Sequence, residues 1–87
     1  MFRLWLKIRK NNHTVKDMVY ESSEDTNRTK KIYKGIEEAC RAWDIAQPVW
    51  LDATIRDFKT RAHCRFTQAN FVETIDFDYL EIQVIEE

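Results

Sequence analysis

The first ten residues alternate between apolar and polar side chains, with every second position from Phe2 to Ile8 apolar. A period of two is typical of a half-buried β-strand. Asn11 and Asn12 follow, and asparagine tolerates the left-handed backbone of a tight reversal. The pattern therefore predicts a hairpin whose second strand covers residues 15–21. It does not decide whether Met18 and Tyr20 or Val15 and Val19 face the core.

Residues 22–31 are all polar or charged, and a helical pattern follows them. Asp25, Thr26 and Asn27 are side chains that cap helix N-termini well. The apolar positions then recur at spacings of three and four, which place them on one stripe of a helix: Ile32, Ile36, Ala39, Cys40 and Trp43. Because Pro48 disfavours helix in the residue before it, we expect this helix to end near Ala46.

The second half of the chain predicts a short helix and two more strands. Asp52 can cap the helix, and its inward residues at helical spacing are Ile55, Phe58 and Ala62. Residues 63–67 alternate as a third strand, and Asn70 marks a turn after it. Residues 77–86 form the fourth strand. Its inward positions are Leu80, Ile82 and Val84, and its outward positions are Tyr79, Glu81, Gln83 and Ile85.

Strands and helices are segregated along the chain in the order β-β-α-α-β-β, which is typical of the α+β class. With 87 residues, we expect a single domain over 1–87 with one core. A four-stranded, mainly antiparallel sheet with both helices on one face would bury the apolar stripes and leave the other face open. The strand order stays open.

Composition narrows the class of protein. Hydrophobic residues make up 44% of the chain and aromatic residues 13%, which is enough apolar material for a folded core. The net charge of -1 supplies no overall attraction to nucleic acid or anionic lipid. Charges interrupt the apolar residues at the N-terminus, so it does not resemble an export signal. We expect a soluble cytoplasmic protein that does not contact membranes.

The two cysteines, Cys40 and Cys64, occupy apolar-face positions, and we expect free, buried, reduced thiols. His63 adjoins Cys64, but neighbours in a strand point to opposite faces and could not share a metal ion. The single glycine, Gly35, lies in the first helix, which excludes a glycine-rich phosphate loop. We expect no cofactor and no metal, and we expect Gly35 to allow a close approach of the helix to its neighbour.

Charge is distributed unevenly along the chain. Up to Lys34 there are nine basic and four acidic residues, whereas from Glu73 onward there are six acidic residues and no basic one. If the first and last strands are neighbours, Arg3, Lys7 or Arg9 would pair with Glu81 or Glu86 across the sheet. The alternative is a nucleic-acid surface on the open face, formed by Trp5, His63 and Arg65 with Lys7 and Arg9.

No motif in the sequence is specific enough to name an enzyme reaction. The candidates are His63 near Arg65 and the carboxylates Asp52, Asp57, Asp76 and Asp78. Asp76 and Asp78 could share a face and hold a divalent cation or act as an acid and base pair. Aspartates at element boundaries are far more often caps or turn formers, so we expect no catalytic residue.

The pattern favours a non-catalytic protein-interaction module. An exposed apolar patch in a small domain usually marks a contact surface, and here it would meet another protein or a second copy of the chain. The residues expected on this surface are Arg3, Trp5, Lys7, Arg9, His63, Arg65, Tyr79, Glu81 and Ile85. Binding of nucleic acid through the basic N-terminal half is the alternative.

Three segments carry a resemblance to other proteins: Met1–Trp5, Pro48–Asp52 and Phe77–Glu87. Together they resemble a group of small bacterial α+β proteins with no assigned function, across nearly the whole chain. The resemblance implies a single domain and a bacterial cytoplasmic origin. It implies nothing about mechanism.

Overall fold

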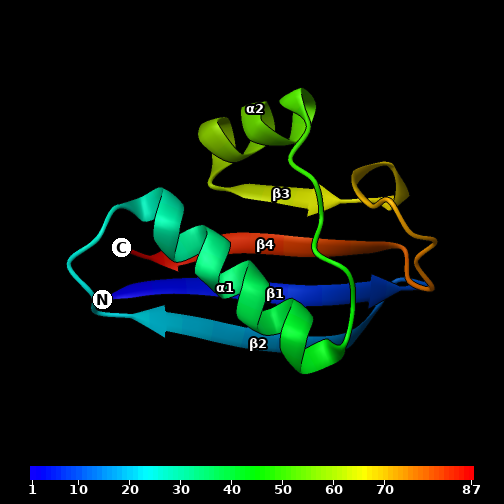
Figure 1. Cartoon of the computed structure of the whole chain (residues 1–87), viewed down its shortest axis with the longest axis horizontal. Helices are drawn as coiled ribbons and strands as arrows, with labels where there is room; N and C mark the ends of the chain where they lie inside the picture. Colours follow the sequence, from blue (N-terminus) through cyan, green and yellow to red (C-terminus); the bar gives the residue numbers. More distant parts are fainter.

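The computed structural model describes all 87 residues, and it confirms the α+β class and the predicted order of elements. The strands are β1 (Phe2–Lys10), β2 (His13–Ser22), β3 (His63–Phe66) and β4 (Tyr79–Glu86), and the helices are α1 (Arg28–Trp43) and α2 (Asp52–Arg61). The strands form one antiparallel sheet in the order β2-β1-β4-β3. Both helices lie on the same face, where α1 crosses β1 and β2 and α2 packs beside β3 (Figure 1). Neither α1 nor α2 has the length and the apolar character that a membrane-spanning helix requires.

The β1–β2 hairpin turns at Asn11 and Asn12, whose φ angles of 52° and 63° are both left-handed. Two left-handed residues match the right-handed twist of the flanking strands, as in a type I′ turn. The resulting register sets Tyr20 opposite Leu4 and Met18 opposite Leu6. The sequence left the inward face of β2 open, and this register places Met18 and Tyr20 on the core side.

Helix α1 begins and ends through local hydrogen bonds. The side chain of Asn27 accepts a hydrogen bond of 2.9 Å from the backbone amide of Lys30, which makes Asn27 the N-cap. The helix ends at Trp43, before the predicted Ala46, because Asp44 adopts a left-handed backbone with φ 53°. The amide of Ile45 then donates to the carbonyl of Cys40 at 3.0 Å, which completes the C-terminal cap.

Gly35 lies where α1 passes closest to the sheet. A Cβ atom at this position would lie 3.0 Å from Leu4 Cδ2 and 3.0 Å from Tyr20 Cδ2. Ordinary carbon contacts are about 3.5–4.0 Å, so any side chain here would overlap its neighbours. The expectation that Gly35 permits a close approach is confirmed.

Helix α2 differs from the prediction at two positions. Leu51 is its N-cap residue without a side-chain bond, and Asp52 is the first helical residue. A carboxylate in the first turn still stabilises the positive end of the helix dipole. Thr54 and Phe58 are buried, whereas Ile55 is 37% exposed and was wrongly predicted to face the core. The buried stripe of α2 is narrower than predicted because the helix packs mainly on one short strand, β3.

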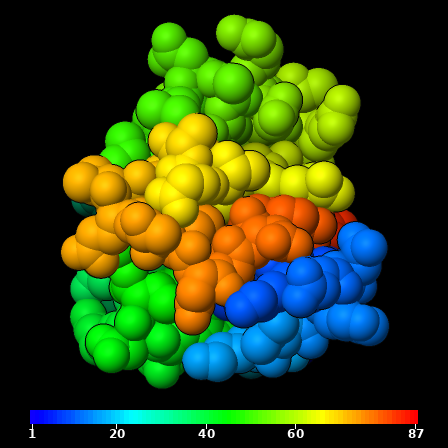
Figure 2. Space-filling model, turned by 90° about the vertical axis from the view of Figure 1, so that its right-hand side faces the viewer, coloured from blue at the N-terminus to red at the C-terminus, as the bar shows by residue number.

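The segment between β3 and β4 packs against two distant parts of the chain. Asn70 is buried, and its side-chain amide nitrogen donates to Thr54 Oγ1 at 2.8 Å and to the Val49 carbonyl at 3.0 Å. At the other end, Asp78 accepts from the amide of Asn11 at 2.9 Å and donates its own amide to the Arg9 carbonyl. In Figure 2 this orange segment lies against the blue hairpin of β1 and β2.

Strand β4 begins at Tyr79 rather than at Phe77. The ring of Phe77 packs edge-on against Phe71, with centroids 5.7 Å apart, and both side chains contact the core. This packing removes residues 77 and 78 from the ladder. The centre of the core lies between α1 and the middle strands, and its fully buried side chains include Leu4, Leu6, Cys40, Phe66, Leu80 and Ile82.

Candidate functional site

The sheet face that the helices leave uncovered carries the predicted surface residues. On β1, the positions that alternate with the buried Leu4, Leu6 and Ile8 point to this face. They are Arg3, Trp5, Lys7 and Arg9. In the ladder Lys7 lies opposite Glu81, Glu81 opposite Arg65, and Arg9 opposite Tyr79. His63 shares this face two residues before Arg65. We call these residues the outer sheet face.

Ile85 does not follow the predicted alternation. The β1–β4 register shifts between Arg3 and Leu4, so Leu4 lies opposite Val84 while Arg3 lies opposite Glu86. The shift leaves Ile85 between two pairs, as the extra residue of a bulge does. Ile85 is 45% exposed, but the ladder does not pair it with any residue of the outer sheet face.

Glu81 lies at the centre of the outer sheet face and is buried although no helix covers it. Its carboxylate lies 3.3 Å from Lys7 Nζ and 3.9 Å from Arg65 Nε, and it forms a hydrogen bond with His63 Nε2. Burial alone would raise the pKa of Glu81, but the hydrogen bonds and charges of His63 and Lys7 outweigh it, and the pKa is lowered. Glu81 is therefore an ionised centre of a charged cluster.

Two aromatic rings on this face lie beneath cations. The ammonium of Lys7 is 3.9 Å from the centroid of the Trp5 ring, and the guanidinium carbon of Arg65 is 4.7 Å from that of Tyr79. The indole nitrogen of Trp5 also donates to Asp17 Oδ2 at 3.1 Å. Cation–π contacts and this hydrogen bond hold both rings in place, so the face is an ordered surface of aromatic and charged groups.

Two basic residues of the first strand form ion pairs with acidic residues of the neighbouring strands. Lys7 pairs with Glu81, and Arg3 lies 3.4 Å from Glu86 and 2.8 Å from Glu21. The prediction that bases of the first strand meet acids of the last is confirmed for these two residues. Arg9 instead donates to the hydroxyl of Thr14 at 2.7 Å.

Among the carboxylates considered for catalysis, Asp78 contacts the hairpin turn, whereas Asp52 and Asp57 belong to α2. The Asp78 carboxylate accepts a hydrogen bond from the Asn11 amide in that turn, and Asp52 lies in the first turn of α2. Asp57 lies on the same helix, and burial together with its negative charge raises the pKa of Cys64. No three His, Cys, Asp or Glu side chains lie close enough together to hold a metal ion.

Both cysteines are buried and are not bonded to each other. Burial raises the pKa of Cys40 to about 11, and burial together with Asp57 raises that of Cys64 to about 12. A thiol with such a pKa is almost entirely protonated at neutral pH and is a poor nucleophile.

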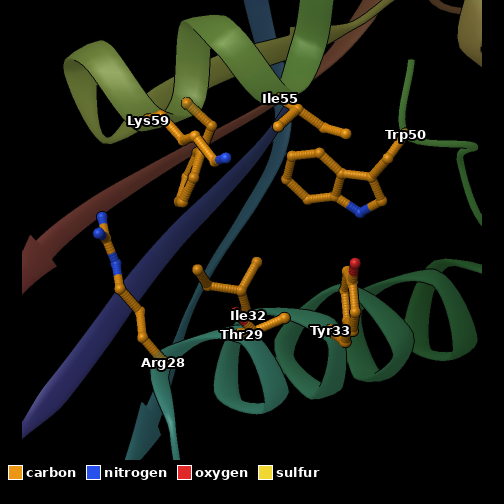
Figure 3. Close-up of a pocket in the computed structure, with 8 residues that line it drawn as sticks. Arg28, Thr29, Ile32, Tyr33, Trp50, Ile55 and Lys59 are labelled. Atoms are coloured by element: carbon orange, nitrogen blue, oxygen red, sulfur yellow. The ribbon is translucent and has the colours of Figure 1, made fainter. Parts of the chain in front are cut away.

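A second candidate site, which is concave and was not predicted from the sequence, lies between the helices (Figure 3). We call it the interhelical groove. Its volume is about 320 Å³, and the residues lining it are Arg28, Thr29, Ile32, Tyr33, Trp50, Ile55, Phe58 and Lys59. Two signals in the sequence could have indicated it. Tyr33 is an aromatic residue off the buried stripe of α1, and Val49 to Leu51 form an apolar run outside any helix.

Comparison of the chain with family models, with curated proteins and with solved structures found no match in any of the three. The resemblance to small bacterial proteins thus stays a prediction.

Proposed function

We propose that this chain is a non-catalytic protein-interaction module of the cytoplasm that pairs with a second copy of itself through the outer sheet face. The observation that carries the proposal is the composition of that face. Tyr, Trp and Arg are the residue types most enriched where proteins bind one another. Trp5, Tyr79 and Arg65 supply them on rigid strands, and the cation–π contacts reduce the conformational entropy lost on binding.

The centre of the contact would be the cross-strand pair of Trp5 and Val19. These residues lie directly opposite each other on β1 and β2, and Val19 is 44% exposed. Ile85, which was also expected on this surface, lies in the bulge of β4 and does not belong to this pair. Bases of β1 lie between acids on both sides, Glu21 on β2 and Glu81 on β4. A two-fold contact sets one patch against itself, so a small offset would bring the bases of one copy against the acids of the other.

Light scattering at increasing protein concentration tests the proposal. We expect about twice the monomer mass of 10.5 kDa at tens of micromolar, because two-fold dimers are the commonest assembly. Val19→Glu should give a monomer, since it introduces an unpaired charge at the centre of the contact. The matched control is Val72→Glu, because Val72 is 91% exposed and lies outside the sheet. A monomer mass at all concentrations ends the self-association proposal.

Nucleic-acid binding is the competing function, and the charge pairing on the face argues against it. Arg3 and Lys7 each have a carboxylate within 3.4 Å, which would have to be displaced by phosphate. We expect no change in the mobility of a labelled oligonucleotide at moderate salt. Saturable binding that weakens with salt and is lost in the Lys7→Glu, Arg9→Glu double variant would favour the nucleic-acid function instead.

A further inference from the structure

The interhelical groove has an aromatic end. The Trp50 ring meets Tyr33 and Phe58 edge-on, with centroids 6.1 Å and 5.7 Å apart. Ile32 from α1 and Ile55 from α2 add aliphatic surface to the walls (Figure 3). Tyr33 is 53% exposed and Ile55 is 37% exposed. An apolar body placed here would remove both side chains from water.

The other end of the groove is positively charged. Arg28 lies at the end away from Trp50 and Tyr33, and Lys59 reaches in from α2 (Figure 3). No carboxylate lines the groove. Arg28 is also the first residue of α1, so the positive end of the helix dipole lies on the same side.

Arg28 already holds a carboxylate in this structure. Its Nε lies 3.1 Å from Oε1 of Glu87, an exposed residue that follows β4. Both side chains are exposed, and exposed ion pairs of this kind are weak, so another carboxylate can displace Glu87. The charged groups at the mouth of the groove can therefore bind a carboxylate.

The size of the groove favours a small molecule over a peptide. Its volume of about 320 Å³ is at the lower end of the range for ligand pockets. On α1 the lining covers Arg28 to Tyr33, which is only about 9 Å of helix at 1.5 Å per residue. A docked peptide helix uses anchors over at least two turns and would extend beyond the groove.

We propose that the interhelical groove binds a small monocarboxylate that carries an aromatic ring. The ring lies between Trp50 and Ile55, and the carboxylate binds Arg28 and Lys59 in place of Glu87. The site lies on the helical side of the molecule and is independent of the outer sheet face.

NMR titration of the full chain with phenylpropionate tests the site. We expect saturable shifts of the backbone amides of α1 and α2 that line the groove and of the Trp50 indole, with the outer sheet face unaffected. Two matched probes separate the contribution of the aromatic ring from that of the negative charge. Phenylpropanamide keeps the ring without the charge and should bind about tenfold more weakly, the effect of one charge-assisted hydrogen bond. Acetate keeps the charge without the ring and should give no saturable shift.

Three variants test whether the charged end of the groove contributes to ligand binding. Lys59→Gln and Arg28→Gln should each weaken binding about threefold to tenfold, whereas the distant control Lys10→Gln should leave it unchanged. Glu87→Gln should strengthen binding, because it removes the competing carboxylate from Arg28. Absence of saturable shifts at millimolar phenylpropionate, equal binding of acid and amide, or shifts confined to other surfaces would overturn the proposal.

Discussion

Lys7 and Glu81 form an ion pair of 3.3 Å across β1 and β4, on a sheet face that no helix covers, and their side chains are only 15% and 11% exposed. The neighbours on the same face produce this burial. His63 and Arg65 approach Glu81 from β3, and the Trp5 ring lies beneath the ammonium of Lys7. The pair is therefore screened less by solvent than an ordinary surface ion pair.

Glu81→Gln, which keeps the side-chain shape and removes the charge, should lower the free energy of unfolding by about 2 kcal/mol. Urea denaturation measures the change. Lys7→Met removes the partner, and the double variant should lose about 1 kcal/mol less than the sum of the single variants, because contacting charges are coupled. Additive losses would show that Lys7 and Glu81 act independently. Arg41→Met, in the exposed pair with Glu37, serves as a control with little effect.

Stability should depend on pH in the acidic range through Glu81. Its pKa is lower in the folded protein than in the unfolded chain, so its contribution is complete above the unfolded pKa and is lost as the pH falls through the folded pKa. Denaturation curves compared at neutral pH and below about pH 4.3, the ordinary pKa of glutamate, measure this loss. The difference between the native sequence and Glu81→Gln should shrink in acid. A constant difference at every pH would contradict the assignment.

Gly35→Ala should destabilise the protein by about 1 kcal/mol or more, although alanine favours helix by about that amount. The reason is the overlap of the added methyl group with Leu4 and Tyr20, each 3.0 Å away. Thermal unfolding measures the change. Ala42→Gly, at an exposed position of the same helix, gives the propensity effect alone. Stabilisation by Gly35→Ala would mean that the sheet can move away from α1.

Asn70→Ala should cost about 2–4 kcal/mol, since it removes three hydrogen bonds and leaves buried partners unsatisfied. These bonds join Asn70 to the Thr67 amide, the Val49 carbonyl and the Thr54 hydroxyl. Thr54→Val removes only one of them and should cost about 1 kcal/mol. Chemical denaturation of the double variant should show coupling between the two sites. Equal losses for Asn70→Ala and Thr54→Val would limit the role of Asn70 to the single bond.

Neither thiol of the native protein should react with a disulfide reagent at mildly alkaline pH. Both are buried, and the pKa is about 11 for Cys40 and about 12 for Cys64. Both should react rapidly in denaturant, which exposes them and restores an ordinary pKa. Ala42→Cys places an exposed thiol on α1 as a positive control. Rapid native labelling at Cys40 or Cys64 would show that the core opens locally.

Local pattern predicted the fold class well, because strand and helix periods depend only on which side chains avoid water. The alternation of β1, the stripe of α1 and the turn at Asn11 and Asn12 were all readable, and each reappears in the structure. Element ends were less readable. Helix α1 ends at Trp43 because Asp44 adopts a left-handed backbone, and aspartate is compatible with several other conformations.

The sequence by itself determined the alternating faces, and hence that Trp5, Lys7 and Glu81 would point away from the core. Only the tertiary structure decided that β1 lies beside β4, which brings Lys7 to Glu81. It also decided that α1 and α2 leave a groove between them, with Ile55 in its wall. The physical reason is that burial patterns specify which face is apolar, whereas neighbours are chosen by long-range packing and loop closure, which no short window of sequence contains.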